Sequence, residues 1–161
     1  FDFPLVQIGA DKYCLELFHG PTKAFKDVGA RFMSRILGYF KAQDSNKSHV
    51  LVATSGDTGA AVANGFLNID GVEVHILFPK GKVSEYQERQ MTTLGGNINA
   101  YEVEGTFDDC QSLVKQAFSD NVLKEKMSLS SANSINVARF LPQMLYYFIA
   151  SNTLKNKNLN F

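Results

Sequence analysis

Short apolar runs alternate with longer amphipathic stretches along most of the chain, and this alternation restricts the fold more than any other feature. Strands are predicted for residues 12–18, 48–54, 72–78 and 98–103. The run 48–54 is largely apolar, as expected for a strand that is buried on both faces of a parallel sheet. The pattern predicts an α/β fold with three αβα layers and a mainly parallel sheet.

The stretches between these strands carry helical periodicity. Helices are predicted for residues 25–43, 59–67, 84–94, 106–119 and 135–151. Pro142 is expected to divide the last helix, because proline disrupts a helix interior. Residues 152–160 are rich in Asn and Lys and are predicted to form a loop. No linker interrupts the pattern, so residues 1–161 are expected to form one α/β unit.

Charge and cysteine content exclude several classes of function. The 161 residues carry 16 basic and 16 acidic side chains, so no net field attracts nucleic acid or an anionic membrane. No run reaches the roughly 18 to 20 apolar residues of a membrane span. Cys14 and Cys110 lie far apart, which favours reduced thiols in a cytoplasmic protein. Neither the cysteines nor the histidines have metal-ligand spacing, and no metal site is predicted.

The segment 54–59, Thr-Ser-Gly-Asp-Thr-Gly, joins a predicted buried strand to a helix of small residues. Backbone N–H groups at a helix start, together with Ser and Thr hydroxyls, suit a phosphate or a carboxylate. The segment is neither a Walker A loop nor a dinucleotide fingerprint, because both spacings are missing. An ordinary glycine-rich turn is the alternative interpretation.

Lys26 stands at the start of a predicted helix, where the helix dipole disfavours a cation. The dipole and desolvation both lower the pKa of an ammonium group, and Schiff-base chemistry requires a neutral amine. The structural alternative is a solvated lysine paired with Asp27. Lys23, three residues earlier, is a rival for the chemical role.

The segment 131–139 combines Ser and Asn residues with Arg139 at the start of a predicted helix. Amide donors and a guanidinium fork suit a phosphate ester. A multiply capped helix with a surface arginine is the alternative interpretation. Ligands of parallel sheets bind beyond the carboxyl ends of the strands, where a site is therefore expected.

Taken together, four strings resemble the threonine synthases, members of the tryptophan-synthase-beta-like group of pyridoxal-phosphate enzymes. The strings are LFHGPTKAFKDVGARF, LVATSGDTGAAVANGF, ILFPKGKVSEYQERQMTTLGGNINAYEVEGTFDDCQSLV and SSANSINVARFLPQMLYYF. They cover nearly the whole chain in the order of the family. The resemblance implies the fold type II of these enzymes, here incomplete. Residues 46–130 would form the core of the small domain, with the flanks belonging to the larger domain.

The resemblance also implies roles for single residues. Lys26 matches the lysine that forms a Schiff base with pyridoxal 5'-phosphate, and the pocket beside the cofactor would include Thr22, Phe25 and Asp57. The loop that receives the substrate carboxylate matches Ser55, Gly56, Asp57 and Thr58. The residues that hold the substrate phosphate match Asn133, Ser134 and Arg139. Many related enzymes have Asn in place of Asp57, so its backbone N–H is expected to matter more than its carboxylate.

The implied reaction converts O-phospho-L-homoserine and water into L-threonine and phosphate. The family's loop for the cofactor phosphate is expected beyond residue 161, so the isolated chain is expected to bind the cofactor weakly and to be inactive. The resemblance is compatible with a homodimer. Two alternatives stay open: another lyase of the same group, such as a serine or threonine dehydratase or a cysteine synthase, and a non-catalytic α/β domain that binds an anion or a nucleotide.

Overall fold

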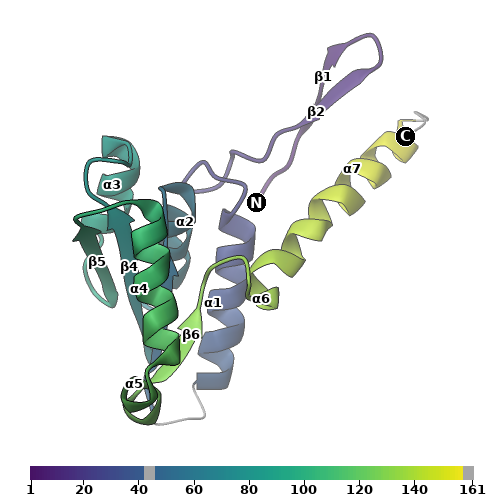
Figure 1. Cartoon of the computed structure of the whole chain (residues 1–161). Helices are drawn as coiled ribbons and strands as arrows, with labels where there is room; N and C mark the ends of the chain where they lie inside the picture. Colours follow the sequence, from purple (N-terminus) through teal and green to yellow (C-terminus); the bar gives the residue numbers. More distant parts are fainter. Residues whose placement is uncertain (42–45, 158–161) are drawn as a thin grey trace.

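A computed structural model describes residues 1–41 and 46–157 of the chain. At its centre lies a parallel sheet with the strand order β5-β4-β3-β6 (Figure 1). The strands are β3 (Ser48–Ala53), β4 (Val72–Pro79), β5 (Ile98–Val103) and β6 (Ser128–Ser131). The predicted α/β fold with a parallel sheet is confirmed. The sequence pattern gives no strand at β6, because three of its four residues are serine.

Helices cover both faces of this sheet. One face carries α1 (Asp27–Lys41), α2 (Asp57–Phe66) and α3 (Glu85–Thr92), and the other carries α4 (Phe107–Ser119), which α5 (Asn121–Lys126) connects to β6. Successive residues of a strand point to opposite faces. Val50 and Val52 accordingly belong to the core beneath α1 and α2, whereas Ala53 packs with Cys110 and Val114 of α4. The three αβα layers are thus present.

The predicted helix boundaries differ from the observed ones by a few residues. α1 begins two residues later than predicted, at Asp27, and α2 begins two residues earlier, at Asp57. The predicted end of the first helix at Gln43 lies outside the described residues. Ser84 and Thr106 precede α3 and α4 and close a capping box with the side chain three residues on. These two helices therefore start where their caps place them.

Two arms project from the α/β unit toward the same side (Figure 1). One is an antiparallel hairpin of β1 (Leu5–Gly9) and β2 (Lys12–Leu15). The other consists of α6 (Val137–Phe140), the 3-10 helix η1 (Leu141–Met144) and α7 (Leu145–Asn156). The predicted strand 12–18 is wrong in its extent, because β2 ends at Leu15 and pairs with β1 rather than with the main sheet.

The second arm confirms one prediction and overturns another. Pro142 lies in η1 and divides the helical segment, as predicted. The loop predicted for residues 152–160 is wrong as far as Asn156, because Leu154 is buried and holds the last turns of α7 in place. Residues 158–160 lie outside the described part. Within residues 1–41 and 46–157, no helix is both long and apolar enough to span a bilayer.

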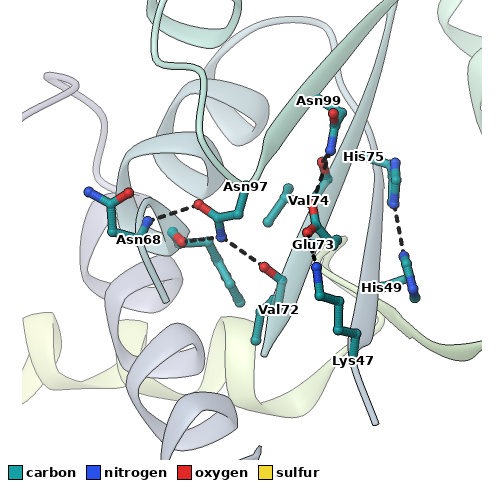
Figure 2. Close-up of polar contacts among 10 residues, drawn as sticks. Lys47, His49, Asn68, Val72, Glu73, Val74, His75, Asn97 and Asn99 are labelled. Carbon is teal, nitrogen blue, oxygen red and sulfur yellow. Dashed lines mark hydrogen bonds and ion pairs between the residues drawn. The ribbon is translucent and has the colours of Figure 1, made fainter. Parts of the chain in front are cut away.

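Polar side chains tie the strands together away from their carboxyl ends (Figure 2). Asn97 Nδ2 donates to the carbonyl oxygens of Phe66 and Val72, both at 2.9 Å, and so joins the end of α2 to the start of β4. His49 Nδ1 lies 3.1 Å from His75 Nε2 on the neighbouring strand. Burial and the neighbouring His49 lower the pKa of His75. The two histidines therefore pair with one another and brace β3 against β4.

Candidate active site

The three polar segments meet beyond the carboxyl end of β3. They surround a cavity of about 360 Å³, which helices α4, α6 and η1 also border. The predicted site residues that line it are Phe25, Lys26, Ser55, Thr58, Asn133, Ser134 and Arg139. The predicted residues Thr22, Gly56 and Asp57 are not among its lining residues. The cavity lies where ligands of parallel sheets bind.

Lys26 is the amine of this cavity. It directly precedes α1, and its Nζ donates a hydrogen bond to Thr58 Oγ1 at 2.9 Å. Burial lowers the pKa of Lys26, the carboxylate of Asp57 opposes this shift, and the guanidinium of Arg139 adds to it. Lys23, the rival, is exposed and does not line the cavity. The geometry therefore favours Lys26 for chemistry that needs a neutral amine.

The loop before Lys26 is held by a buried carboxylate. Asp27 accepts hydrogen bonds from the backbone N–H of Thr22, at 3.0 Å, and from the Thr22 hydroxyl. The alternative in which Asp27 pairs with Lys26 is wrong, because that carboxylate faces Thr22. Thr22, which is predicted to lie beside the cofactor, is buried and does not line the cavity, and its bonds to Asp27 hold the loop that carries Lys26.

The turn after β3 is organised by Thr54, which the sequence did not single out as a site residue. Its buried Oγ1 accepts hydrogen bonds from the N–H groups of Gly56 and Gly59, both at 2.9 Å. Gly56 has a φ of +138°, a conformation that favours glycine. The turn directs Ser55 and Thr58 to the cavity. A threonine at a strand end, before a glycine-bearing helix start, is the signal that could have identified it.

Asp57 does not line the cavity. It is exposed in the first turn of α2, and its Oδ1 accepts a hydrogen bond from Gln87 Nε2 of α3 at 2.7 Å. Its charge still reaches the site, because it raises the pKa of Lys26. Gln87 gives no sequence signal of a link to Asp57, since the two residues lie 30 positions apart.

Asn133 joins the third segment to the sheet. Its Nδ2 donates to the carbonyl oxygen of Ala53 at 2.8 Å, and its Oδ1 accepts from the N–H of Ala53 at 3.2 Å. Asn136 adds a helix cap, because its Oδ1 accepts from the N–H of Ala138 at 3.0 Å. The carboxamide of Asn133 thus extends the backbone pairing of β3, and Ser134 beside it is exposed at the cavity.

Arg139 is the most unusual side chain of the cavity. Only 3% of its surface is exposed, and its Nε has no hydrogen-bond partner in the described part of the chain. Burial lowers the pKa of Arg139, whereas Tyr146 and Asp27 oppose this shift. The predicted alternative of a surface arginine is wrong. A buried guanidinium N–H that lacks a partner is suited to an anionic ligand.

Besides Ala53 and Thr54, four further residues line the cavity without having been predicted: Phe107, Gln111, Phe140 and Gln143. The first two lie on α4, and the others lie on α6 and η1. In the sequence they fit the amphipathic pattern of their helices, which does not distinguish a side chain at a cavity from one at an interface. The packing of α4 against β3 brings Phe107 and Gln111 to the site, and the packing of α6 and η1 against α1 brings Phe140 and Gln143 there.

Comparison with known proteins identifies the class. Residues 5–144 match the family model described as pyridoxal-phosphate dependent enzyme, and the chain belongs to this family. Within it, the relatives that the chain resembles are threonine synthases. The chain is 52% identical to the threonine synthase of Buchnera aphidicola subsp. Acyrthosiphon pisum, and the match covers 99% of this chain and 38% of that relative. It is 51% identical to the Escherichia coli threonine synthase, and this match covers 99% of this chain and 37% of the relative.

A solved structure agrees with these relatives. The crystal structure of pyridoxal-phosphate-bound threonine synthase from Brucella melitensis superimposes with a TM-score of 0.87 and 48% identity. The superposition covers 94% of this chain and 33% of that one. The chain therefore spans little more than a third of the length of the relatives that it matches.

Proposed function

We propose that the chain is the lysine-bearing segment of a threonine synthase, which converts O-phospho-L-homoserine and water into L-threonine and phosphate with pyridoxal 5'-phosphate. The observation that carries this proposal is one cavity that contains both the Lys26 amine and the buried Arg139 guanidinium. An amine with a lowered pKa suits an aldehyde cofactor, and a buried guanidinium suits a phosphate ester. The identity to threonine synthases supports the substrate.

The residues of the cavity fit the cofactor. Lys26 supplies a half-buried primary amine, and the Phe25 ring centroid lies 5.7 Å from its Nζ. We propose Lys26 as the point of covalent attachment, with Phe25 as a wall of the pocket and Thr22 as the residue that keeps the loop in place. Asp57 would act on the pocket through its charge. When bound, the cofactor supplies an electron sink for bond changes in the substrate.

The start of α2 is proposed to bind the substrate carboxylate. The first N–H groups of a helix have no partner within the helix, and the dipole favours an anion there. Thr54 takes up the N–H groups of Gly56 and Gly59. The donors that then face a ligand are the hydroxyls of Ser55 and Thr58 and the backbone N–H groups of residues 57 and 58. Gly56 contributes the conformation of the turn rather than a contact.

Arg139 and Ser134 are proposed to bind the phosphate of the substrate. The guanidinium offers N–H groups in a fixed fork, which matches phosphate oxygens. Asn133 keeps the segment against Ala53, and its Nδ2 has a second hydrogen that can reach the ligand. Residues 46–130 are proposed as the core of a small domain in the full-length enzyme, which we place in the cytoplasm.

Lys26 and Arg139 then have separate tasks in the reaction. As a neutral amine, Lys26 can accept protons from the α and β carbons of the substrate and return them to the α carbon and to the γ carbon that the phosphate leaves. Arg139 orients the phosphate and neutralises its charge as it leaves. Thr58, which holds Nζ at 2.9 Å, keeps the amine directed toward these carbons. Water adds at the β carbon to give threonine.

The test uses the full-length protein and two lysine variants. After incubation with pyridoxal 5'-phosphate and borohydride, mass spectrometry should find the reduced cofactor on Lys26, and the protein should release phosphate from O-phospho-L-homoserine. Lys26→Ala should remove the label and lower the rate of phosphate release by roughly 10³-fold or more. Lys23→Ala, the matched control, should retain both.

Two other outcomes would contradict the proposal in different ways. A label on Lys26 without phosphate release, combined with turnover of serine or threonine, would indicate a dehydratase. Absence of the label from wild-type protein, or a label that persists in Lys26→Ala, would indicate an anion-binding domain whose lysine is structural.

A further inference from the structure

Gln87 lies outside the cavity but contacts the turn that lines it. Its Nε2 donates to Asp57 Oδ1 at 2.7 Å. Its Oε1 accepts from the hydroxyl of Ser84 at 2.9 Å and from the N–H of Ser84 at 3.3 Å. The Gln87 side chain therefore forms part of the N-terminal cap of α3 and also contacts Asp57, the charged residue of α2.

We propose that Gln87 is a positioning residue that fixes the Asp57 carboxylate and the turn 55–58, and thereby the charge beside the Lys26 amine. This inference deepens the proposed function, on which its meaning for catalysis rests.

The capping box determines which way the carboxamide points. The backbone N–H of Ser84 can only donate and its hydroxyl can donate as well, so the atom that both contact is assigned as the amide oxygen. The amide nitrogen is then directed toward Asp57 Oδ1. An ionised carboxylate has no proton to donate, so this oxygen is the acceptor. An asparagine at position 57 could turn its own N–H toward Gln87, whereas both oxygens of the Asp57 carboxylate are acceptors.

The backbone of the turn also rests on this carboxamide. A Cβ at Gly56 would lie 2.4 Å from Gln87 Cδ and 2.5 Å from its Nε2 and Oε1. Gly56 leads directly into α2, between Ser55 and Asp57. Gln87 thus packs on the peptide that aims Ser55 at the cavity while it holds the next side chain by a hydrogen bond. Loss of the Gln87 carboxamide should therefore free both the peptide at Gly56 and the Asp57 side chain to move.

The charge of Asp57 connects this contact to the amine. Asp57 raises the pKa of Lys26, against the larger effect of burial. When the carboxylate loses its donor, it can turn into solvent, and its effect on Lys26 should weaken. A second carboxylate at position 87 should have the opposite effect, since it adds negative charge next to Asp57. The two substitutions therefore predict shifts of opposite sign.

The experiment measures the pH midpoint of Lys26 acetylation by acetic anhydride in the cofactor-free full-length protein, read by mass spectrometry. Gln87→Glu should raise this midpoint by about half a pH unit, and Gln87→Met should lower it by a similar amount. Hydrogen exchange of residues 55–59 should become at least several-fold faster in Gln87→Met. Gln116→Glu and Gln116→Met, on the exposed side of α4, serve as matched controls and should change neither quantity.

A midpoint and an exchange rate in Gln87→Met that equal those of wild type would overturn the proposal. If Gln87→Glu fails to fold, Gln87→Met decides, because methionine keeps the length of the side chain and adds no charge. Neither measurement uses a substrate. A shift in the midpoint in a protein that does not turn over O-phospho-L-homoserine would therefore leave the positioning role intact and remove only the proposed function.

Discussion

The two polar walls of the cavity differ in how far the chain satisfies its own hydrogen-bonding groups. On the wall formed by the turn after β3, Thr54 pairs with two backbone N–H groups, and Thr58 accepts from Lys26. On the wall formed by the segment after β6, Arg139 is buried with an Nε that has no partner among the described residues. The fold itself satisfies the polar groups named on the first wall, whereas we propose that a bound anion completes the second.

This difference separates residues that the fold needs from residues that only the ligand needs. Buried polar groups cost free energy unless they are paired, so a chain retains an unpaired one where it has a use. Substitutions on the first wall should therefore alter stability and activity together. Substitutions of Arg139 should alter activity alone.

The largest effect is expected for Arg139→Met in the full-length protein. Methionine fills much of the same space without the charge, and loss of a buried ionic contact to the ligand costs about 2–5 kcal/mol. The value of kcat/KM for O-phospho-L-homoserine should therefore fall by roughly 30-fold to several thousand-fold. The urea midpoint should stay the same or rise, because burial disfavours the guanidinium charge more than Asp27 and Tyr146 favour it.

A substantial loss of stability in Arg139→Met would break the comparison, since it would mean that the fold depends on this guanidinium. Arg139→Lys separates the role of the charge from that of the guanidinium geometry. Lysine keeps the charge but not the fork of N–H groups, and it should recover only part of the activity.

The second prediction concerns Thr54→Val on the satisfied wall. Valine has the shape of threonine but leaves the N–H groups of Gly56 and Gly59 without their acceptor, and each such group costs about 1–3 kcal/mol. The free energy of unfolding should fall by at least the cost of one such group, and kcat/KM should fall with it. Thr54→Ser retains the hydroxyl and should lose less of both. Unchanged urea unfolding of Thr54→Val would show that water replaces the hydroxyl.

How much of the molecule the sequence predicts depends on the range of the interactions involved. The continuous apolar run from Val50 to Ala53 identifies β3, and Ser84 can cap the start of α3 through a contact only three residues away. β6 depends on pairing with β3 about 80 residues earlier, and its serines carry no strand signal of their own. The last turns of α7 likewise depend on the burial of Leu154 rather than on local composition.

The same limit applies to the site. Lys26, Ser55 and Arg139 were predicted because they stand in segments expected beyond the strand ends and match a known family, and all three line one cavity. Asp57 was also predicted as a site residue, but it does not line the cavity, and its side chain is held by Gln87, a partner that no local pattern reveals. Identity and position along the chain were predictable, whereas the direction of a side chain was not.

The third prediction tests the contact between α1 and the unsatisfied wall. A Cβ at Gly29 would lie 2.1 Å from the carbonyl oxygen of Arg139 and 2.7 Å from its Nη1. Gly29→Ala should therefore displace α6 and cost about 1–3 kcal/mol of stability, as overpacking does. Gly38→Ala lies in the same helix, where its Cβ would meet only Ile69 Cγ2 at 3.0 Å. That control should lose less stability, because alanine also favours a helix. Equal urea midpoints for the two variants would contradict the close packing.

The smallest effect is a change in the pH dependence of stability caused by Lys26. The pKa of Lys26 is lowered in the folded protein, mainly by burial, whereas the unfolded chain has the ordinary lysine value of about 10.4. Between these two values the unfolded state binds more protons, so stability rises with pH. Below the folded pKa both states are charged, and the full cost of the buried ammonium is present.

Thermal unfolding of the cofactor-free full-length protein at pH 7 to about 10 tests this sign. Lys26→Met should have a higher Tm than wild type at neutral pH, and the difference should shrink as the pH approaches the ordinary lysine pKa. Lys23→Met, on an exposed residue, should run parallel to wild type. If the Lys26→Met curve were parallel as well, the cavity would not disfavour the ammonium form. The Lys26 ammonium would then be as well paired as the N–H groups that Thr54 binds, and a chemical role for the neutral amine would lose its physical basis.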